Sequence, residues 1–501
     1  MGLDGFPSDQ LANHLQKERG DFTAADLRRY VLDHDIHMMN FRYVGGNGRL
    51  KTLSFALRDE QHIDELLHDG ERVDGSSLFS CIEPAASDLY VVPRYATAFE
   101  DPFSEEPTLS VLCSYFDRKG EPLDMAPENL PLRAEAALSD RLGLQMHALG
   151  EIEYYVVYHA ESELYPGVPQ HNYHESQPFV KWAAMREGAI RELARLGAQV
   201  KYAHAEVGDV VTEGDLRMEQ HEIEFLPEPL AVAADHVVLA KWLLRNLSSR
   251  AGVAVTFAPK LVTGHAGNGM HFHLGLSRDG QNALSNKDDK LTDSALKAIG
   301  GLLTLAPALT AFGNKNPASY LRLVPRQEAP TYICWGETNR SALVRIPLSW
   351  FGVSGMVARA NPRDPDARKW ESVSMQTLEW RASDGSADVH QLVAGLASAI
   401  LHGHSDAAAV ARAKNLHIEG NLFDDDAQVD RLDRMPGSCA ESAEALLAHR
   451  NAFERDGVFP PALIDGIARE LAAFDDRELL AKARGDAELS AKLAEEYFHC
   501  G

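Results

Sequence analysis

Two glutamates placed two positions apart give the first indication of chemistry in this chain. Glu151 and Glu153 stand in the apolar segment 150–156. Residues i and i+2 of a strand point to the same face, so both carboxylates share one side while Ile152 points to the other. A single pair of this kind is usually a solvated strand face. It gains functional meaning only if other segments place further polar groups beside it.

The same spacing recurs in two further apolar segments. His271 and His273 are two residues apart, and so are Glu379 and Arg381. Several carboxylates on one face of a sheet would repel one another unless cations lay between them. Oxygen-rich sites with an occasional imidazole suit Mg²⁺ or Mn²⁺. The pattern therefore predicts divalent metal ions between these strands.

Arginines within apolar sequence point to an anionic partner. Arg322, Arg340 and Arg345 each lie among apolar residues, and guanidinium forks match the geometry of carboxylate and phosphate groups. Structural ion pairs are the alternative explanation. Two further acids, Glu206 and Glu222, stand between the first strand and the histidines. Since neither a Gly-x-Ser-x-Gly nucleophile motif nor a Walker glycine loop is present, the residues favour phosphoryl transfer by positioning and charge neutralisation.

Alternating helices and strands must hold these side chains. The spacing of apolar residues predicts helices at 132–142, 178–196 and 230–250 and extended segments at 147–158, 200–207 and 253–260. Nearer the N-terminus we expect an amphipathic segment at Ala24–Asp33, a hairpin from 37–43 and 50–57, and strands at Asp88–Pro93 and Thr108–Phe116. The sequence after residue 440 is rich in Ala and Leu and predicts helices.

A proline-rich stretch separates these two groups of elements. Pro122, Pro127 and Pro131 follow the last strand of the first group. We therefore expect a small sheet domain at residues 1–125 and a larger mixed α/β domain at residues 126–501, the second including the helical C-terminal part. A chain of 501 residues is long enough for two domains of unequal size.

Composition excludes several classes of function. Acidic residues outnumber basic ones by 74 to 49, for a formal charge of −25, and no basic block could follow a nucleic-acid backbone. We therefore expect no nucleic-acid partner. Five scattered cysteines predict reduced thiols rather than disulfides. Without a leader or a long apolar run, we also expect no membrane association and a cytoplasmic location.

The motifs together resemble the glutamine synthetase family, type I-like, over nearly the whole chain and in the order of that family. The resemblance rests on eight motifs: Asp74-Gly75-Ser76-Ser77 with Ser87-Asp88, Glu151-Ile152-Glu153, His204-Ala205-Glu206, Gln220-His221-Glu222, Gly267-Asn268-Gly269-Met270-His271, Arg322-Leu323-Val324-Pro325 with Glu328-Ala329-Pro330, Asn339-Arg340-Ser341-Ala342, and Glu379-Trp380-Arg381. Each motif is moderately specific, but eight in one order are not expected by chance.

The resemblance implies an α+β fold and a ring-shaped assembly. It implies a small N-terminal β-grasp-like domain and a large catalytic domain with a curved, mainly antiparallel sheet covered by helices. It further implies a dodecamer-like homo-oligomer with active sites between subunits, so that the Asp74 loop would serve the neighbouring subunit. The expected cofactors are ATP and two or three Mg²⁺ or Mn²⁺ ions per site.

The resemblance also implies a role for each motif residue. Glu153, Glu206 and Glu222 would bind one metal ion, and Glu151, His271 and Glu379 would bind the second. The implied catalytic residues are Asp74, Glu328, Arg340 and Arg381. Glutamate and ammonium would contact Ser77, Tyr173, Gly267, Arg322 and Arg345, and the nucleotide would contact His273 and Arg345. Glu328 would lie on a flap that shields the intermediate from water.

The implied reaction joins L-glutamate to ammonia through a γ-glutamyl phosphate. Departures from the family pattern keep alternatives open: Ala266 replaces an Asn that contacts the glutamate amino-acid group, Thr377 replaces an Arg at ATP, and Phe423 stands where some relatives carry a modified Tyr. Extra residues near 208–218 and 349–376 have the composition of exposed loops. The alternatives are a γ-glutamyl ligase for an organic amine of the polyamine or ethanolamine type, a non-catalytic relative, and a dinuclear metal hydrolase.

Overall fold

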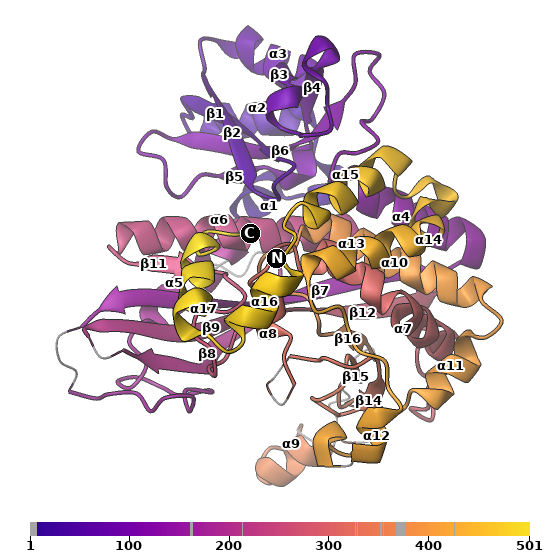
Figure 1. Cartoon of the computed structure of the whole chain (residues 1–501). Coiled ribbons are helices and arrows are strands. Elements are labelled where there is room, and N and C mark those ends of the chain that lie inside the picture. Colours follow the sequence, from indigo (N-terminus) through magenta and orange to yellow (C-terminus); the bar gives the residue numbers. More distant parts are fainter. Residues whose placement is uncertain are drawn as a thin grey trace.

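The structure is a computed structural model, which describes residues 8–160, 164–212, 214–325, 327, 329–350, 353, 355–366, 376–424 and 426–501. It contains a smaller sheet unit at the N-terminal end and a larger body in which helices surround a second sheet (Figure 1). The two units lie against each other. Both ends of the described chain lie near their junction.

The N-terminal unit is a mixed sheet covered by short helices. Its strands are β1 (Met38–Val44), β2 (Leu50–Ala56), β3 (Glu71–Asp74), β4 (Asp88–Pro93), β5 (Phe99–Glu100) and β6 (Thr108–Phe116), in the order β2-β1-β6-β4-β3 with β5 paired to β6. β1 and β2 form the predicted antiparallel hairpin, and β1 runs parallel to β6. Its helices are α1 (Gln10–Leu15), α2 (Ala24–Asp33) and α3 (Glu60–Asp69). The predicted segment Ala24–Asp33 is confirmed to its ends, where Thr23 and Asp26 form a capping box.

The larger sheet is mainly antiparallel and curls around the site described below. Its main strands are β7 (Gln145–His159), β8 (Val200–Val211), β9 (Leu216–Phe225), β12 (Met270–Arg278), β14 (Trp335–Glu337), β15 (Val344–Ile346) and β16 (Leu378–Trp380), in the order β14-β15-β16-β12-β7-β9-β8. The short strands β10 (Glu228–Pro229), β11 (Ala254–Thr256) and β13 (Gln281–Asn282) pair at the sides of β7 and β12. This confirms the expected fold class.

Helices cover the face of this sheet that is turned away from the site. Those that contribute most to the core are α4 (Asn129–Leu142), α5 (Ala183–Arg195), α6 (Leu230–Arg250), α7 (Asp293–Gly313), α10 (Val389–Ser405), α13 (Cys439–Ala448) and α15 (Pro461–Ala472). The other helices of this body are α8 (Ser319–Arg322), α9 (Gly355–Ala360), α11 (Ala409–Asn415), α12 (Asp426–Asp430), α14 (Arg450–Glu454), α16 (Arg477–Ala483) and α17 (Ala487–Glu496). The predicted helical C-terminal part is therefore present.

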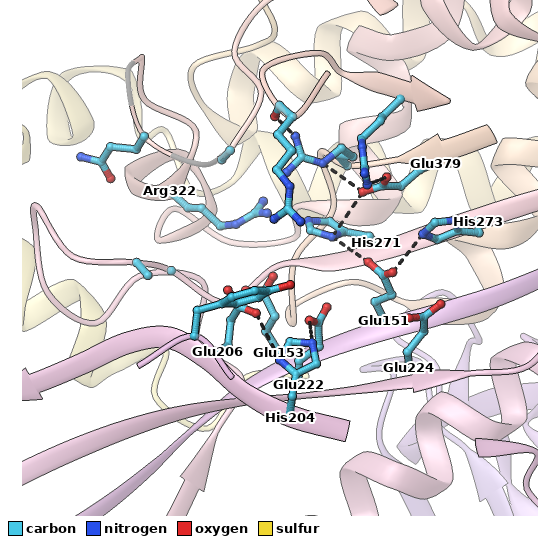
Figure 2. A pocket seen from close by; sticks show the side chains of 18 of the residues that line it. Glu151, Glu153, His204, Glu206, Glu222, Glu224, His271, His273, Arg322 and Glu379 are labelled. Carbon is cyan, nitrogen blue, oxygen red and sulfur yellow. Dashed lines mark hydrogen bonds and ion pairs between the residues drawn. The ribbon is translucent and has the colours of Figure 1, made fainter. Parts of the chain in front are cut away.

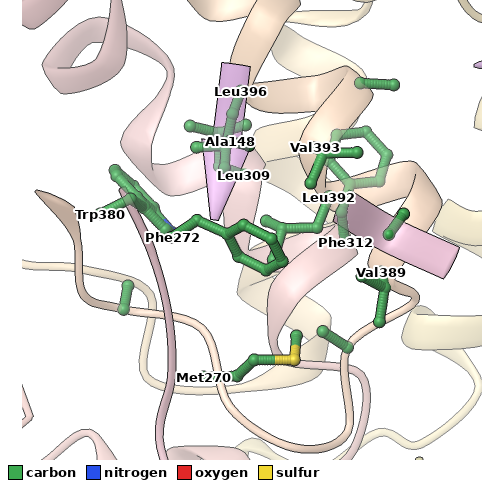
Figure 3. Close-up of a cluster of buried hydrophobic side chains, with 14 of the residues drawn as sticks. Ala148, Met270, Phe272, Leu309, Phe312, Trp380, Val389, Leu392, Val393 and Leu396 are labelled. Carbon is green, nitrogen blue, oxygen red and sulfur yellow. The ribbon is translucent and has the colours of Figure 1, made fainter. Parts of the chain in front are cut away.

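A core of buried hydrophobic side chains packs the sheet against α7 and α10. Phe272 of β12 and Trp380 of β16 are fully buried and point toward Leu309 and Leu392 of these helices (Figure 3). The two helices approach closely at Gly301, where a Cβ would lie 2.0 Å from the carbonyl oxygen of Ala399. Because Phe272 points into the core, its neighbours His271 and His273 must point to the opposite face.

Helix α7 is long and apolar enough to pass for a membrane span. Among the described residues it alone meets that criterion, and 78% of its most apolar window is buried inside the protein. Such burial is what the central helix of a globular core shows. The apolar composition of α7 is therefore explained by its packing against α10, α11 and α13.

Three predicted elements differ from those observed, and the first is the extended segment predicted at 253–260, of which only Ala254–Thr256 forms a strand. The helix expected from residue 178 begins at Ala183 because the Glu219 carboxylate of β9 accepts hydrogen bonds from the backbone N–H groups of Lys181 and Trp182, at 2.8 and 2.9 Å. This cap comes from a distant strand. The expectation of an exposed loop at 208–218 is wrong for most of its length, because β8 continues to Val211 and β9 already begins at Leu216.

Candidate active site

A cavity of about 550 Å³ lies on the open face of the larger sheet. Its lining includes thirteen residues that the sequence predicted for the site: Glu151, Glu153, Tyr173, Glu206, Glu222, Gly267, His271, His273, Arg322, Arg340, Arg345, Glu379 and Arg381. These residues come from segments more than 200 positions apart. The fold therefore brings most of the predicted site together in one chain.

Strand pairing explains how the acids and imidazoles meet. Across neighbouring strands, Glu151 of β7 lies opposite His271 of β12, and Glu153 lies opposite Glu222 of β9. Residues opposite each other in antiparallel strands hold their Cβ atoms within about 5.5 Å. In the same way, His273 lies opposite Glu379 of β16. The two-residue spacing of the sequence thus becomes a continuous polar surface across β9, β7, β12 and β16.

One group of side chains is centred on Glu151. Its carboxylate lies 3.1 Å from Nδ1 of His271 and 2.9 Å from Nε2 of His273 (Figure 2). Burial opposes ionisation of Glu151, but His273 and His271 hold the pKa of its carboxyl well below the usual value. Glu379 is bound by Arg345 at 2.7 Å and by Arg381 at 3.0 Å. These carboxylates are therefore kept ionised.

A second group is rich in carboxylates and has fewer cations. It contains Glu153, Glu206, Glu222 and His204 (Figure 2). Burial, followed by the nearby charges of Glu153 and Glu222, raises the pKa of Glu206 to about 9. Burial, followed by Glu151 and Glu153, also raises the pKa of Glu222 well above its usual value. Crowded carboxylates of this kind ionise readily once a cation lies among them.

The ligand atoms fall into overlapping sets that fit divalent ions. Three sets have all their ligand atoms within 4.8 Å: Glu151, His273 and Glu379; Glu151, Glu222 and His271; and His204, Glu206 and Glu222. Carboxylate oxygens with few imidazoles suit Mg²⁺ or Mn²⁺. The donor set fits the expected ions, although the groupings are not identical with the two sets that the sequence predicted.

His204 is a site residue that the prediction did not include. Its Nε2 lies 3.0 Å from Glu222, and its Nδ1 lies 3.6 Å from Glu206. His204 and Glu206 stand two residues apart on β8, so the spacing that drew attention to Glu151 and Glu153 would have found this pair as well. Seven more polar residues were missed and line the cavity: Gln170, Lys201, Tyr202, Glu224, Lys260, His265 and Gln327.

Glu153 is held in place by groups behind it. Its carboxylate accepts hydrogen bonds from the N–H of Gly269 at 2.7 Å and from Nε2 of Gln220 at 3.2 Å. Gln220 is fully buried, and its Oε1 accepts a hydrogen bond from the N–H of Gly208. Buried partners of this kind orient a metal-binding carboxylate.

Arginines line the same cavity as the acids. Arg322 is 5% exposed and donates from Nη1 to the carbonyl of Ala382 at 2.9 Å. Gly267 lies against Arg322, and a Cβ at this position would lie 2.2 Å from the carbonyl oxygen of Pro259. Only glycine fits there. The guanidinium of Arg340 lies 5.9 Å from the ring of Tyr173.

Two of the described site predictions do not line this cavity. Asp74 and Ser77 belong to the N-terminal unit and do not line it. Asp74 is exposed and accepts a 2.6 Å hydrogen bond from Ser77, and the hydroxyl groups of Ser77 and Ser76 lower the pKa of its carboxyl. The predicted ammonium-binding set is therefore divided, with Tyr173 in the cavity and Asp74 outside it. Glu328 lies outside the described residues.

Ala266 lies at the wall of the cavity beside Gln170. The N–H of Ala266 donates to Oε1 of Gln170 at 2.7 Å, and Nε2 of Gln170 donates to the carbonyl of Asp209 at 3.3 Å. Gln170 thereby ties the segment before Tyr173 to the wall. Of the extra residues at 349–376, the described part includes the exposed helix α9.

Models of protein families match both parts of the chain. The model described as "Glutamine synthetase, beta-Grasp domain" matches residues 35–118, and "Glutamine synthetase, catalytic domain" matches residues 126–469. The N-terminal sheet unit is thus a β-grasp domain, as expected.

Named relatives agree with these matches over most of their length. "Glutamine synthetase" of Thermococcus kodakarensis is 31% identical over 85% of this chain and 87% of its own. "Glutamine synthetase" of Pseudomonas aeruginosa is 28% identical over 87% and 92%. A relative from Cupriavidus pinatubonensis named "3-hydroxylaminophenol mutase" is 29% identical over 88% and 93%.

Solved structures share the fold at lower identity. A cryo-EM structure of Plasmodium falciparum glutamine synthetase superposes with a TM-score of 0.72 at 16% identity, covering 91% of this chain and 96% of its own. A structure titled "GmaS/ADP complex-Conformation 1" superposes with a TM-score of 0.70 at 18% identity, covering 92% and 99%. The family model for the catalytic domain spans more than half of the chain, and from this match we conclude that the chain belongs to the glutamine synthetase family of ligases.

Proposed function

We propose that this chain is an ATP-dependent ligase that forms an amide from L-glutamate and ammonia through γ-glutamyl phosphate. One observation carries the proposal: carboxylates and imidazoles of β7, β8, β9, β12 and β16 line one cavity together with Arg322, Arg340, Arg345 and Arg381. Hydrolysis at a two-metal site does not by itself account for four arginine side chains in the same cavity. Phosphoryl transfer needs both halves of this arrangement.

Each half of the cavity has a distinct task in this proposal. Glu153, Glu206 and Glu222 would hold one divalent ion, and Glu151, His271 and Glu379 a second. His204 and His273 lie close enough to join these sets. The bound ions would neutralise charge on the phosphate oxygens. The carboxylates of the protein would fix where those ions, and therefore the phosphates, lie.

The arginines would stabilise the charge that develops during transfer. A γ-carboxylate oxygen of glutamate forms a bond to the terminal phosphorus of ATP as the bond to ADP breaks. Arg340, Arg345 and Arg381 would face the transferred group, and Arg322 would bind the α-carboxylate beside Gly267. The amine nitrogen then attacks the acyl carbon and phosphate leaves. Closing the cavity to water would protect the acyl phosphate from hydrolysis.

The position of Asp74 supports active sites between subunits. Asp74 is exposed on the N-terminal unit and lies outside the chain's own cavity. If it takes the proton of ammonium, it must do so for a neighbouring copy. We therefore include a ring-shaped homo-oligomer, dodecamer-like, and a cytoplasmic location in the proposal.

An organic amine is the second candidate for the acceptor. Aromatic rings gather beside Glu206: the ring of His204 lies 5.3 Å from Tyr173 and 5.9 Å from Tyr202, and both tyrosines line the cavity and are about half exposed. Aromatic faces with nearby carboxylates bind organic ammonium groups. Ala266 also leaves more room than an Asn would at that wall.

Product analysis with a panel of amines separates the two candidates. Purified protein would be incubated with ATP, Mg²⁺ or Mn²⁺ and L-glutamate, together with ammonium, ethanolamine, putrescine or spermidine. Release of ADP with formation of glutamine supports the first candidate. An amide with an organic amine only would replace it by the second. If no amine in the panel gave ATP-dependent amide formation, both candidates would be contradicted.

A further inference from the structure

A second cavity, of about 270 Å³, lies at the junction of the two units, away from the proposed active site. Its lining comes from the β1–β2 turn, from α6 and from the C-terminal residues: Gly48, Arg49, Leu50, Val238, Lys241, Trp242, Arg245, Asn246, His499 and Gly501. In Figure 1 the C-terminus lies between the N-terminal unit and the body. Three separate segments thus meet around one space.

Three cationic side chains converge on this cavity, and the described Asp and Glu side chains form no ion pair with them. Lys241 is 3% exposed, Arg245 is half-buried and Arg49 is exposed. Within the described part of the chain, no Asp or Glu side chain forms an ion pair with any of the three. Lys241 donates to the carbonyl of Gly385 at 2.8 Å, and Arg245 donates to the carbonyl of Cys500 at 2.8 Å.

The electrostatics show that these cations repel one another. Burial, followed by the charge of Arg245, lowers the pKa of Lys241 to about 8. Burial, followed by the charge of Arg49, lowers the pKa of Arg245 to about 10. The carboxylates that act on Lys241 at longer range, Asp384 and Asp388, are engaged with Ser386 and Gln391. Buried cations without an anion are costly to a fold.

We propose that this cavity binds a phosphate group. Three cations match the charge of about −1.5 to −2 that a phosphate monoester carries near pH 7 better than the single charge of a carboxylate. A guanidinium fork such as that of Arg245 can bind two oxygens of one phosphate. A water molecule occupies about 30 Å³ in the liquid, so the cavity has room for a phosphate group and several waters. The apolar side chains of Leu50 and Val238 form the remaining wall.

The bound phosphate would contact both units, and through Lys241 it would be linked to the segment that follows Arg381. Arg49 belongs to the N-terminal unit, whereas Lys241 and Arg245 belong to α6 of the body. The carbonyl of Gly385 that accepts from Lys241 lies in the segment that follows Arg381. Binding would therefore hold the β-grasp domain against the catalytic domain. This inference stands on the second cavity alone and does not depend on the proposed function.

Calorimetric titration of the full chain tests the site. The probes are inorganic phosphate and glycerol phosphate at constant ionic strength. The variants are Arg49→Gln and Arg245→Gln, with Arg72→Gln as the matched control, because Arg72 is an exposed arginine of β3 in the same domain. Arg340→Gln separates this site from any phosphate held by the active-site arginines.

We expect wild type, Arg72→Gln and Arg340→Gln to retain a phosphate site that Arg49→Gln and Arg245→Gln weaken at least tenfold. Equal affinity for both probes would make inorganic phosphate the ligand, and tighter binding of glycerol phosphate would assign a phosphorylated metabolite. If Arg245→Gln fails to fold, the Arg49→Gln variant still tests the site, because Arg49 is exposed and its substitution should not disturb folding. Wild-type affinity in Arg49→Gln, loss of all binding in Arg340→Gln, or no binding of either probe overturns the proposal.

Discussion

Arg345 of β15 and Glu379 of β16 lie directly opposite each other and form an ion pair of 2.7 Å. Glu379 is one of the proposed metal ligands, and Arg345 is one of the groups proposed to face phosphate. The pair therefore joins the two halves of the cavity. Before metal ions and phosphate groups bind, Arg345 and Glu379 neutralise each other's charge.

Arg345→Gln is expected to separate phosphate binding from metal binding. Without the guanidinium, we expect kcat to fall by about 10²–10³, as when one preorganised donor to a transition state is removed. The KM for ATP should rise, whereas Mn²⁺ affinity should be unchanged or higher because a competing cation has gone. Steady-state kinetics and Mn²⁺ titration measure these effects. Arg359→Gln, on the exposed helix α9, is the control, and wild-type kinetics in Arg345→Gln would show a purely structural pair.

Gln220→Ala tests the support behind the metal-binding acids. Gln220 donates to the carboxylate of Glu153, to Asn268 and to the carbonyl of Gly267, so its loss frees Glu153 to move. Loss of such an outer partner typically weakens metal affinity by about 10- to 100-fold. Competition with a fluorescent chelator measures the change. Glu228→Gln, at the side of β7 and outside the cavity, is the control; unaltered Mn²⁺ affinity in Gln220→Ala would argue against a metal role for Glu153.

The raised pKa of Glu206 predicts pH-dependent metal binding. Its carboxyl, with a pKa of about 9, retains a proton at pH 7 in the metal-free protein, and a metal ion must displace that proton. Mn²⁺ affinity should therefore rise with pH up to about 9, with proton release near neutral pH. Calorimetry in buffers of different ionisation enthalpy detects this proton. Glu206→Gln should flatten the pH profile, and a profile unchanged by this substitution would contradict the prediction.

The raised pKa of Glu206 also makes the stability of the metal-free protein depend on pH. In the unfolded chain Glu206 loses its proton near the ordinary glutamate pKa, whereas the folded chain keeps it to about pH 9. The folded state thus binds more protons between these values, so this group makes metal-free stability fall as pH rises from about 4.3 to 9. Mn²⁺ should remove that fall. Thermal unfolding with and without Mn²⁺ measures it.

Complementation tests the division of the site between Asp74 and the cavity. Asp74→Ala and Glu153→Gln subunits should each be inactive alone. If an active site takes Asp74 from one subunit and Glu153 from its neighbour, co-expression should restore roughly a quarter of the activity, since each intact half is present with probability one half. Co-expressed subunits that stay inactive would place Asp74 in the same site as Glu153 of its own chain, or outside catalysis.

The spacing of polar residues predicted the centre of the site because strand geometry is local. Two residues apart on a strand means the same face, and Glu151 and His271 meet as a result. Which strands pair is not local. His204 has the same spacing from Glu206, so this local rule could have found it, whereas the position of β8 beside β9 at the edge of the sheet could not be predicted in this way.

Elements set by long-range contacts could not be predicted in detail. The start of α5 depends on the Glu219 carboxylate, 36 or more positions away in the chain. The extension of β8 and β9 depends on pairs such as Asp209 with Glu219, where charge and glycine content indicated a loop. The central helices α7 and α10 are buried on nearly all sides, and neither of them was predicted from the sequence.

The fate of oxygen in the substrate tests the central proposal most directly. L-glutamate labelled with ¹⁸O in its γ-carboxylate would be incubated with ATP, Mg²⁺ and ammonium, or with an amine that supports turnover, and the phosphate released would be analysed by mass spectrometry. Attack of the carboxylate on ATP predicts one ¹⁸O atom transferred to each phosphate formed with amide. Unlabelled phosphate, or amide formation without ATP consumption, would contradict an acyl phosphate and the role proposed for the cavity.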